Sequence, residues 1–168
     1  MRIRLASAQD IDGIAHVHIV SWQTTYPGII ADSVLSRLNV EGRIHLWKKI
    51  FEQDLVDSVI YVLEDDRGTI TGFFQGGKSR SPELGYDAEL YTIYLLQETQ
   101  GLGYGRQLFD VFVDALKQWG YSSFMVWVIE DNPALHFYQK LGGQVVASQK
   151  IKIGGELIKE VALGWDCI

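Results

Sequence analysis

The chain has almost no cysteine and no long apolar run. Cys167 is its single cysteine, so the sequence offers neither a disulfide framework nor a thiol cluster for a metal, and we expect a reducing, cytoplasmic setting. The first ten residues lack the apolar region of a signal peptide, and no stretch approaches the ~18 apolar residues of a membrane span. We therefore expect a soluble protein with no membrane partner.

Basic residues are outnumbered. Fifteen lysines and arginines stand against 21 aspartates and glutamates, a net charge of −6, which disfavours binding to a nucleic-acid backbone and weakly favours cationic small molecules. The four histidines have no cysteine or carboxylate partner at ligand spacing, so no metal site is expected. Linker-like tracts and internal repeats are also lacking. We expect one domain over residues 1–168.

The apolar patterning predicts an α/β domain with a mixed sheet, in the order strand, two helices, three strands, helix, strand, helix and two strands. The predicted strands cover residues 2–6, 58–64, 69–75, 88–96, 123–129, 144–153 and 156–166. The predicted helices cover a segment through 11–22 capped by Ser7, a segment from Asn39 to about Asp54, residues 104–119, and a short segment from Pro133 capped by Asn132.

A glycine turn, Gln100-Gly-Leu-Gly-Tyr-Gly105, lies between a predicted strand and a predicted helix. Three glycines let the backbone curl tightly and present its N–H groups, and the first turn of the helix adds unpaired donors and the positive end of its dipole. We expect a phosphate or pyrophosphate to bind here. The alternative is a plain connection between strand and helix.

Two other phosphate-binding motifs fit less well. Residues 72–79 satisfy the P-loop string, but they continue a strand, and Pro82 shortly afterwards does not suit the helix that a P-loop needs. A phosphotransferase built on Lys78 is therefore a rival hypothesis only. The dinucleotide-binding fingerprint also fails, because the glycines of the turn have the wrong spacing and no acidic residue ends a strand about 20 residues later.

The glycine turn resembles that of the Gcn5-related N-acetyltransferase (GNAT) family, which transfers the acetyl group of acetyl-CoA to an amine. Gln100, Gly103 and Gly105 match the family pattern Gln/Arg-x-x-Gly-x-Gly/Ala. Residues 132–142, Asn-Pro-Ala-Leu-His-Phe-Tyr-Gln-Lys-Leu-Gly, are similar to the family's Asn-x-x-Ala-x-x-Phe-Tyr-x-x-x-Gly segment. The resemblance is strong over residues 88–143 and loose elsewhere.

Two positions depart from the family pattern. Gln97 stands where a proline is common, and Gly143 replaces the aromatic residue that often follows the glycine. Neither position carries chemistry in the family. The resemblance implies a single GNAT-like domain with a mixed, mostly antiparallel sheet of about seven strands and about four flanking helices.

The resemblance also implies where acetyl-CoA binds. In the family, the pantetheine arm pairs with the strand before the glycine turn, which requires that this strand and the next one splay apart. The turn itself binds the pyrophosphate. The positions implied here are Ile93, Tyr94, Leu95, Gln100, Gly101, Leu102, Gly103, Tyr104, Gly105, Arg106 and Asn132.

Transfer to an amine requires that the ammonium lose a proton, and Glu89 occupies a strand position that often bears a glutamate in the family. Strand alternation predicts that Glu89 shares a face with Tyr91 and Ile93; the alternative is a surface glutamate near the start of a strand. Tyr138 is implied as the donor to the departing thiolate, because a phenol stays protonated at neutral pH. Its alternative is a core tyrosine beside Phe137.

The acceptor pocket is less defined. Trp22 and Tyr26 lie where the family builds much of this pocket, although Trp22 also completes the apolar stripe of its helix, which favours a core position for it. We predict an N-acetyltransferase that acts by direct transfer from acetyl-CoA to a primary amine of a small molecule or peptide in a ternary complex, because Cys167 is poorly placed to carry an acetyl group. The alternative is a non-catalytic sensor of CoA or a nucleotide. The last hairpin could pair with a second copy, giving a homodimer, or simply finish the sheet.

Overall fold

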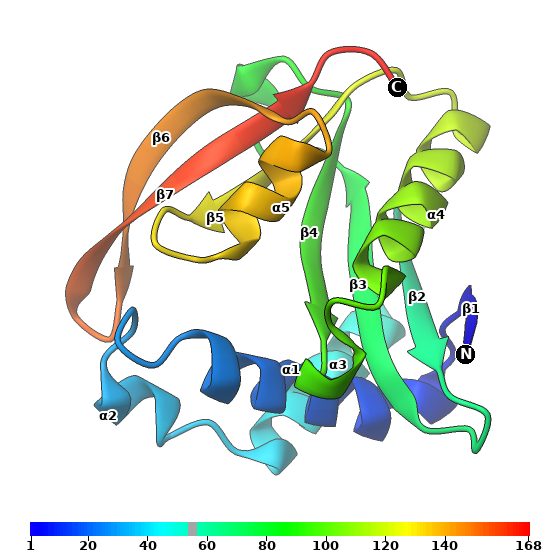
Figure 1. The fold of residues 1–168 in the computed structure, drawn as a ribbon, viewed down its shortest axis with the longest axis vertical. Coiled ribbons are helices and arrows are strands. Elements are labelled where there is room, and N and C mark those ends of the chain that lie inside the picture. Colours follow the sequence, from blue (N-terminus) through cyan, green and yellow to red (C-terminus); the bar gives the residue numbers. More distant parts are fainter. Residues whose placement is uncertain (54–56) are drawn as a thin grey trace.

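The computed structural model describes residues 1–53 and 57–168. Within them, seven strands form one sheet in the order β1-β2-β3-β4-β5-β7-β6 (Figure 1). Neighbouring strands are antiparallel except for the parallel pair β4 and β5. The strands are β1 (Arg2–Leu5), β2 (Ser58–Glu64), β3 (Ile70–Lys78), β4 (Ala88–Leu95), β5 (Phe124–Ile129), β6 (Gln144–Ile153) and β7 (Glu156–Trp165). The predicted mixed, mostly antiparallel sheet is confirmed.

Five α-helices accompany the sheet in the described residues: α1 (Ile11–Thr25), α2 (Asp32–Leu35), α3 (Val40–Glu52), α4 (Tyr104–Gln118) and α5 (Ala134–Lys140). Four of them were predicted, whereas the single turn of α2 was missed. Asn39 caps α3 as predicted, since its Oδ1 accepts a hydrogen bond from the Gly42 N–H at 2.8 Å. The predicted end of that helix, Asp54, lies outside the described residues.

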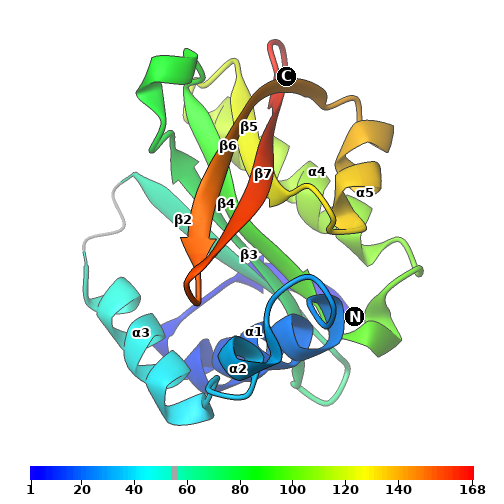
Figure 2. The ribbon, with the colours of Figure 1, turned by 90° about the vertical axis from the view of Figure 1, so that its left-hand side faces the viewer.

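The sheet separates two apolar clusters. One cluster packs α4 against the strands through buried side chains such as Leu108 and Phe112. The other packs α1 and α3 against the opposite face, around Ile14 and Trp47. The two sets of helices lie on different sides of the strands in Figure 2. Successive residues of a strand point to opposite faces, so the Phe73–Phe74 pair of β3 sends one ring into each cluster.

Strands β4 and β5 pair at only two positions, Ala88 with Phe124 and Glu89 with Met125. Beyond these pairs the two strands diverge (Figure 1). The edge of β4 that faces β5 is therefore unpaired with β5 from residue 91 to residue 95, which is the splay that the family resemblance requires.

Strand β4 contains a bulge at Tyr91. The ladder with β3 pairs Gln75 with Thr92 and the next residue, Gly76, with Leu90, so Tyr91 has no partner in β3. An extra residue of this kind reverses the alternation of side chains along the strand.

The bulge changes which residues share a face. Ala88, Leu90 and Ile93 all pack in the cluster on the α4 side, so Glu89 points to the opposite face. The prediction that Glu89 and Ile93 share a face is therefore wrong. The sequence pattern assumed an unbroken alternation, whereas the bulge inserts one residue between them.

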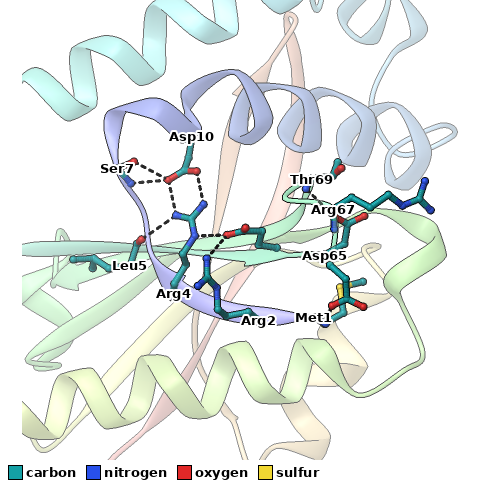
Figure 3. Close-up of polar contacts among 11 residues, drawn as sticks. Met1, Arg2, Arg4, Leu5, Ser7, Asp10, Asp65, Arg67 and Thr69 are labelled. Atoms are coloured by element: carbon teal, nitrogen blue, oxygen red, sulfur yellow. Dashed lines mark hydrogen bonds and ion pairs between the residues drawn. The ribbon is translucent and has the colours of Figure 1, made fainter.

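An arginine joins the first strand to the first helix (Figure 3). Arg4 donates through Nη1 and Nη2 to the Asp10 carboxylate at 2.8 and 2.7 Å, and through Nε to Glu64. The Ser7 N–H also donates to Asp10, at 2.8 Å. Ser7 thus precedes the 3-10 turn Ala8–Asp10 rather than capping α1 directly. The ion pair with Arg4 lowers the pKa of Asp10 to about 2.

The P-loop hypothesis is wrong. Residues 72–78 belong to β3, Lys78 pairs with Ala88, and a 3-10 turn, Pro82–Leu84, follows where a P-loop needs a helix. Over residues 1–53 and 57–168, none of the helices combines the length and the apolar character that crossing a membrane requires.

Candidate active site

A cavity of about 550 Å³ lies where the end of α1, the end of β4, the glycine turn and the start of α5 meet. Most of the residues predicted to contact acetyl-CoA line it: Ile93, Tyr94, Leu95, Gln100, Gly101, Gly103, Gly105, Arg106 and Asn132. Tyr138 lines it as well. Leu102 and Tyr104 are not among the lining residues, and Leu102 is 63% exposed.

The glycine turn directs the start of α4 toward this cavity. Gly101 and Gly103 have φ of 72° and 87°, in the left-handed region that side chains disfavour. The first N–H groups of α4 have no carbonyl partner within the helix. These donors and the positive end of the helix dipole suit a phosphate.

Gly105 leaves room in the cavity wall. A Cβ built on Gly105 would lie 3.4 Å from Leu95 and 3.5 Å from Phe137. Both of those residues line the cavity, so the missing side chain keeps the space between them open. The wall therefore fits a ligand that passes from the glycine turn along β4.

Gln100 ties the turn to the strand before it. Its Nε2 donates to the Leu95 carbonyl at 2.9 Å, and Ser21 Oγ of α1 donates to the same oxygen at 3.3 Å. The end of β4 is thereby held between α1 and the turn. The glutamine of the sequence pattern therefore fixes the glycine turn against the end of β4.

Asn132 joins α5 to the end of α1. Its Oδ1 accepts from the Ala134 N–H at 2.9 Å, which confirms the predicted cap, and its Nδ2 donates to Tyr26 Oη at 3.2 Å. Both residues are buried, and burial raises the pKa of the Tyr26 phenol. Tyr26 itself does not line the cavity.

Tyr138 is 4% exposed and still lines the cavity. Burial raises the pKa of its phenol, so the hydroxyl keeps its proton at neutral pH. The ring lies edge-on to Phe137 at 5.2 Å. The protonated phenol of Tyr138 is therefore a hydrogen-bond donor at the cavity.

Trp22 contacts Tyr94, a residue of the cavity lining, without lining the cavity itself. Its Nε1 donates to Tyr94 Oη at 2.8 Å, and its ring lies 4.9 Å from that of Tyr26. The half-buried indole packs against the cluster around Tyr26 and does not line the cavity. His18 stacks on Tyr94 at 5.0 Å, and burial lowers the pKa of His18 to about 3, so it stays neutral.

Glu89 is not a surface residue, since it is 1% exposed. Its carboxylate accepts from the Arg80 backbone N–H at 2.9 Å and from the Arg80 guanidinium. That guanidinium in turn lies 4.2 Å from the ring centre of Tyr91. Glu89 does not line the cavity, so proton exchange between the two would need an intermediary.

Sequence reasoning missed part of the lining. The missed residues are Ser21, Thr24, Thr25, Pro133, Ala134 and Phe137. The three hydroxyl residues stand at i, i+3 and i+4 near the end of α1, and this spacing places them on one helix face. That pattern could have identified them. In the described part of the chain, no three histidine, cysteine, aspartate or glutamate side chains gather as metal ligands would.

Comparison with known proteins agrees with this arrangement. The model of the acetyltransferase (GNAT) family matches residues 22–143. An uncharacterized N-acetyltransferase, YuaI, of Bacillus subtilis (strain 168) is 42% identical over 163 residues, which cover 97% of this chain and 91% of that protein. The L-amino acid N-acyltransferase MnaT of Escherichia coli (strain K12) is 26% identical over 155 residues, which cover 92% and 85%.

The fold has solved counterparts. The structure of yncA from Salmonella typhimurium, with its cofactor acetyl-CoA, superposes with a TM-score of 0.74 at 23% identity and covers 99% of this chain and 93% of that one. The family match spans the cavity-lining segments of β4, the glycine turn and α5. The chain belongs to the GNAT family of acetyltransferases.

Proposed function

We propose that this acetyltransferase moves the acetyl group of acetyl-CoA directly to a primary amine of a small molecule or peptide while both are bound. The observation that carries the proposal is the open edge of β4, which runs along a cavity of about 550 Å³ that ends at the glycine turn. An extended ligand with amide groups and a pyrophosphate fits these features in that order.

Each part of acetyl-CoA has a fitting environment. The main chains of Ile93, Tyr94 and Leu95 would hold the amides of the pantetheine arm along the unpaired edge, because buried amide groups need hydrogen-bond partners. The N–H groups from Gly101 to Arg106 would hold the pyrophosphate. The thioester would then lie within the cavity near Tyr138.

Two side chains of this chain would handle protons. An ammonium with a pKa near 10.4 must be deprotonated before it can attack, which costs roughly 4 to 5 kcal/mol at neutral pH. Glu89 would accept that proton, through water because it does not line the cavity. Tyr138 would donate to the departing sulfur, since its raised pKa keeps the phenol protonated.

The amine that accepts the acetyl group is to be identified among several classes. The name of the relative MnaT refers to L-amino acids, so α-amines of L-amino acids are the first acceptors to test. Polyamines, amine antibiotics and peptide N-termini complete the panel.

The test has two stages. In a thermal-shift titration, acetyl-CoA should raise the melting temperature, whereas ATP and NAD should not, because only a ligand of the native state stabilises it. A CoA-release assay over the amine panel should then identify an acceptor. Stabilisation by acetyl-CoA without release in the presence of any amine would instead favour the sensor hypothesis.

A further inference from the structure

The end of α1 spans the gap between β4 and α5. Trp22 and the residue after α1, Tyr26, stand at i and i+4, a spacing that places them on one helix face, and their ring centres lie 4.9 Å apart. Trp22 Nε1 donates to Tyr94 Oη of β4 at 2.8 Å. Tyr26 Oη accepts from Asn132 Nδ2, just before α5, at 3.2 Å. Side chains at the end of α1 therefore connect the two sides of the splay.

This connection lies where the sheet does not set the separation of its strands. The pairing of β4 with β5 consists of Ala88 with Phe124 and Glu89 with Met125, so the ladder stops well before the end of β4. The distance between the end of β4 and the start of α5 must be set by contacts outside the ladder. The contacts of Trp22 and Tyr26 are of this kind.

Asn132 passes the constraint on to Tyr138. The Asn132 Oδ1 accepts from the Ala134 N–H at 2.9 Å and so fixes the first turn of α5. Tyr138 stands four residues after Ala134, on the same side of that short helix. Asn132 and Tyr138 both line the cavity. A shift of Asn132 would therefore move the helix that carries the Tyr138 hydroxyl.

The phenol of Tyr26 lies close to two others. Burial raises the pKa of Tyr26, and the phenols of Tyr94 and Tyr138 raise it further, because neighbouring phenolates repel each other and this effect weakens with distance. Tyr26 is nevertheless buried and does not line the cavity. Its hydroxyl is engaged with Asn132 and is not available to a ligand in the cavity.

We propose that Tyr26 is a positioning residue for acetyl transfer. Its hydroxyl holds Asn132, and through Asn132 the start of α5, so that the Tyr138 hydroxyl faces a thioester bound along β4. The inference rests on the proposed function, and it replaces acceptor binding as the role of Tyr26.

Tyr26→Phe removes the hydroxyl and keeps the ring against Trp22. The buried Asn132 amide loses its partner, so the melting temperature should fall. We expect kcat to fall about 10-fold, because a displaced catalytic group loses part of its effect, and the dissociation constant for acetyl-CoA to stay within about threefold. In the Tyr138→Phe background the same substitution should change kcat by no more than about twofold, because Tyr26 then has no hydroxyl left to position.

Tyr86→Phe is the matched control. Tyr86 Oη donates to Asp166 at 2.8 Å, a tyrosine hydrogen bond between distant parts of the sequence that lies outside the cavity lining. Its loss should leave kcat unchanged. Equal fold-losses of kcat for Tyr26→Phe in the wild-type and Tyr138→Phe backgrounds, or no loss in either, would overturn the inference.

Amide hydrogen exchange separates this inference from the proposed function. In Tyr26→Phe, the amides of α5 should exchange faster and those of α4 should not. Unchanged exchange in α5 would overturn the inference whatever the activity. Faster exchange in α5, in a protein whose wild type binds acetyl-CoA but releases no CoA with any amine, would support the link from Tyr26 to α5 and overturn the proposed function.

Discussion

Tyr138 is nearly inaccessible to solvent, yet it borders the cavity. Burial keeps its phenol protonated, which suits a donor to a thiolate and would be of no use to a base.

Tyr138→Phe should therefore lower kcat by about 10²-fold, the low end for a lost general acid, because a thiolate is a fairly good leaving group. The dissociation constant for acetyl-CoA should stay within twofold, since the ring is retained. Stopped assays of CoA release and a binding titration check both values. Tyr61→Phe, in a half-buried ring stacked on Phe74 away from the cavity, is the control and should retain full activity.

At the residue scale, Gln100, Gly103 and Asn132 line one cavity, and the sequence pointed to them because turn and cap requirements act over a few residues. Their contacts with acetyl-CoA stay predictions. The prediction that Glu89 shares a sheet face with Ile93 was wrong, because the bulge at Tyr91 arises from the pairing of β4 with β3. The alternation of side chains that the sequence predicts for this strand does not reveal such an insertion.

Among the elements, α4 depends on an unusual backbone at its start. Gly103 has φ of 87° with nothing within 4 Å of a Cβ, so Gly103→Ala would strain the backbone by about 1–2 kcal/mol without a steric clash. Relief of that strain would move the first N–H groups of the helix. We expect the dissociation constant for acetyl-CoA to rise about 10-fold, or ~1.4 kcal/mol, in a calorimetric titration.

The other end of the same helix supplies the comparison. Gly120 follows α4 with φ of 79° and also has nothing within 4 Å of a Cβ. Gly120→Ala should introduce a similar backbone strain and so lower the melting temperature about as much as Gly103→Ala does. It should leave acetyl-CoA affinity unchanged. Equal loss of affinity in both variants would mean that helix stability, rather than the turn, controls binding.

Element prediction from sequence was accurate for the strands and for four helices. Their apolar patterns and caps are local. The single turn of α2 was missed because a four-residue helix, Asp32–Leu35, has too few residues for a helical period to show. The hydroxyl face of α1, formed by Ser21, Thr24 and Thr25, was overlooked although its i, i+3 and i+4 spacing is visible in the sequence. That this face lines the cavity follows only from the packing of α1 beside β4.

For the whole molecule, the bridge from Arg4 to Asp10 and Glu64 links β1 and β2 to the start of α1. Asp10 is 7% exposed, and its pKa is lowered from 3.8 to about 2. A carboxyl group with a lowered folded-state pKa stabilises the fold above its unfolded pKa, and that contribution is lost as pH falls through the folded value. The window is therefore about pH 4 down to pH 2.

Asp10→Asn should lower the free energy of unfolding by about 2 kcal/mol at pH 7, by the size of that shift. The difference from wild type should shrink as pH falls through this window. Urea unfolding at several pH values measures both effects. Asp66→Asn removes an ion pair to the N-terminus in which Asp66 is 93% exposed, and it should change stability very little.

The two-pair junction between β4 and β5 divides the sheet into halves that share very little backbone bonding. Amide hydrogens of β4 that face β5 should exchange with deuterated solvent faster than those of β3, which pairs on both sides. Acetyl-CoA should slow exchange selectively in β4 and β5 by taking the place of a missing strand. Bound acetyl-CoA would then connect the two halves of the sheet as well as supply the acetyl group.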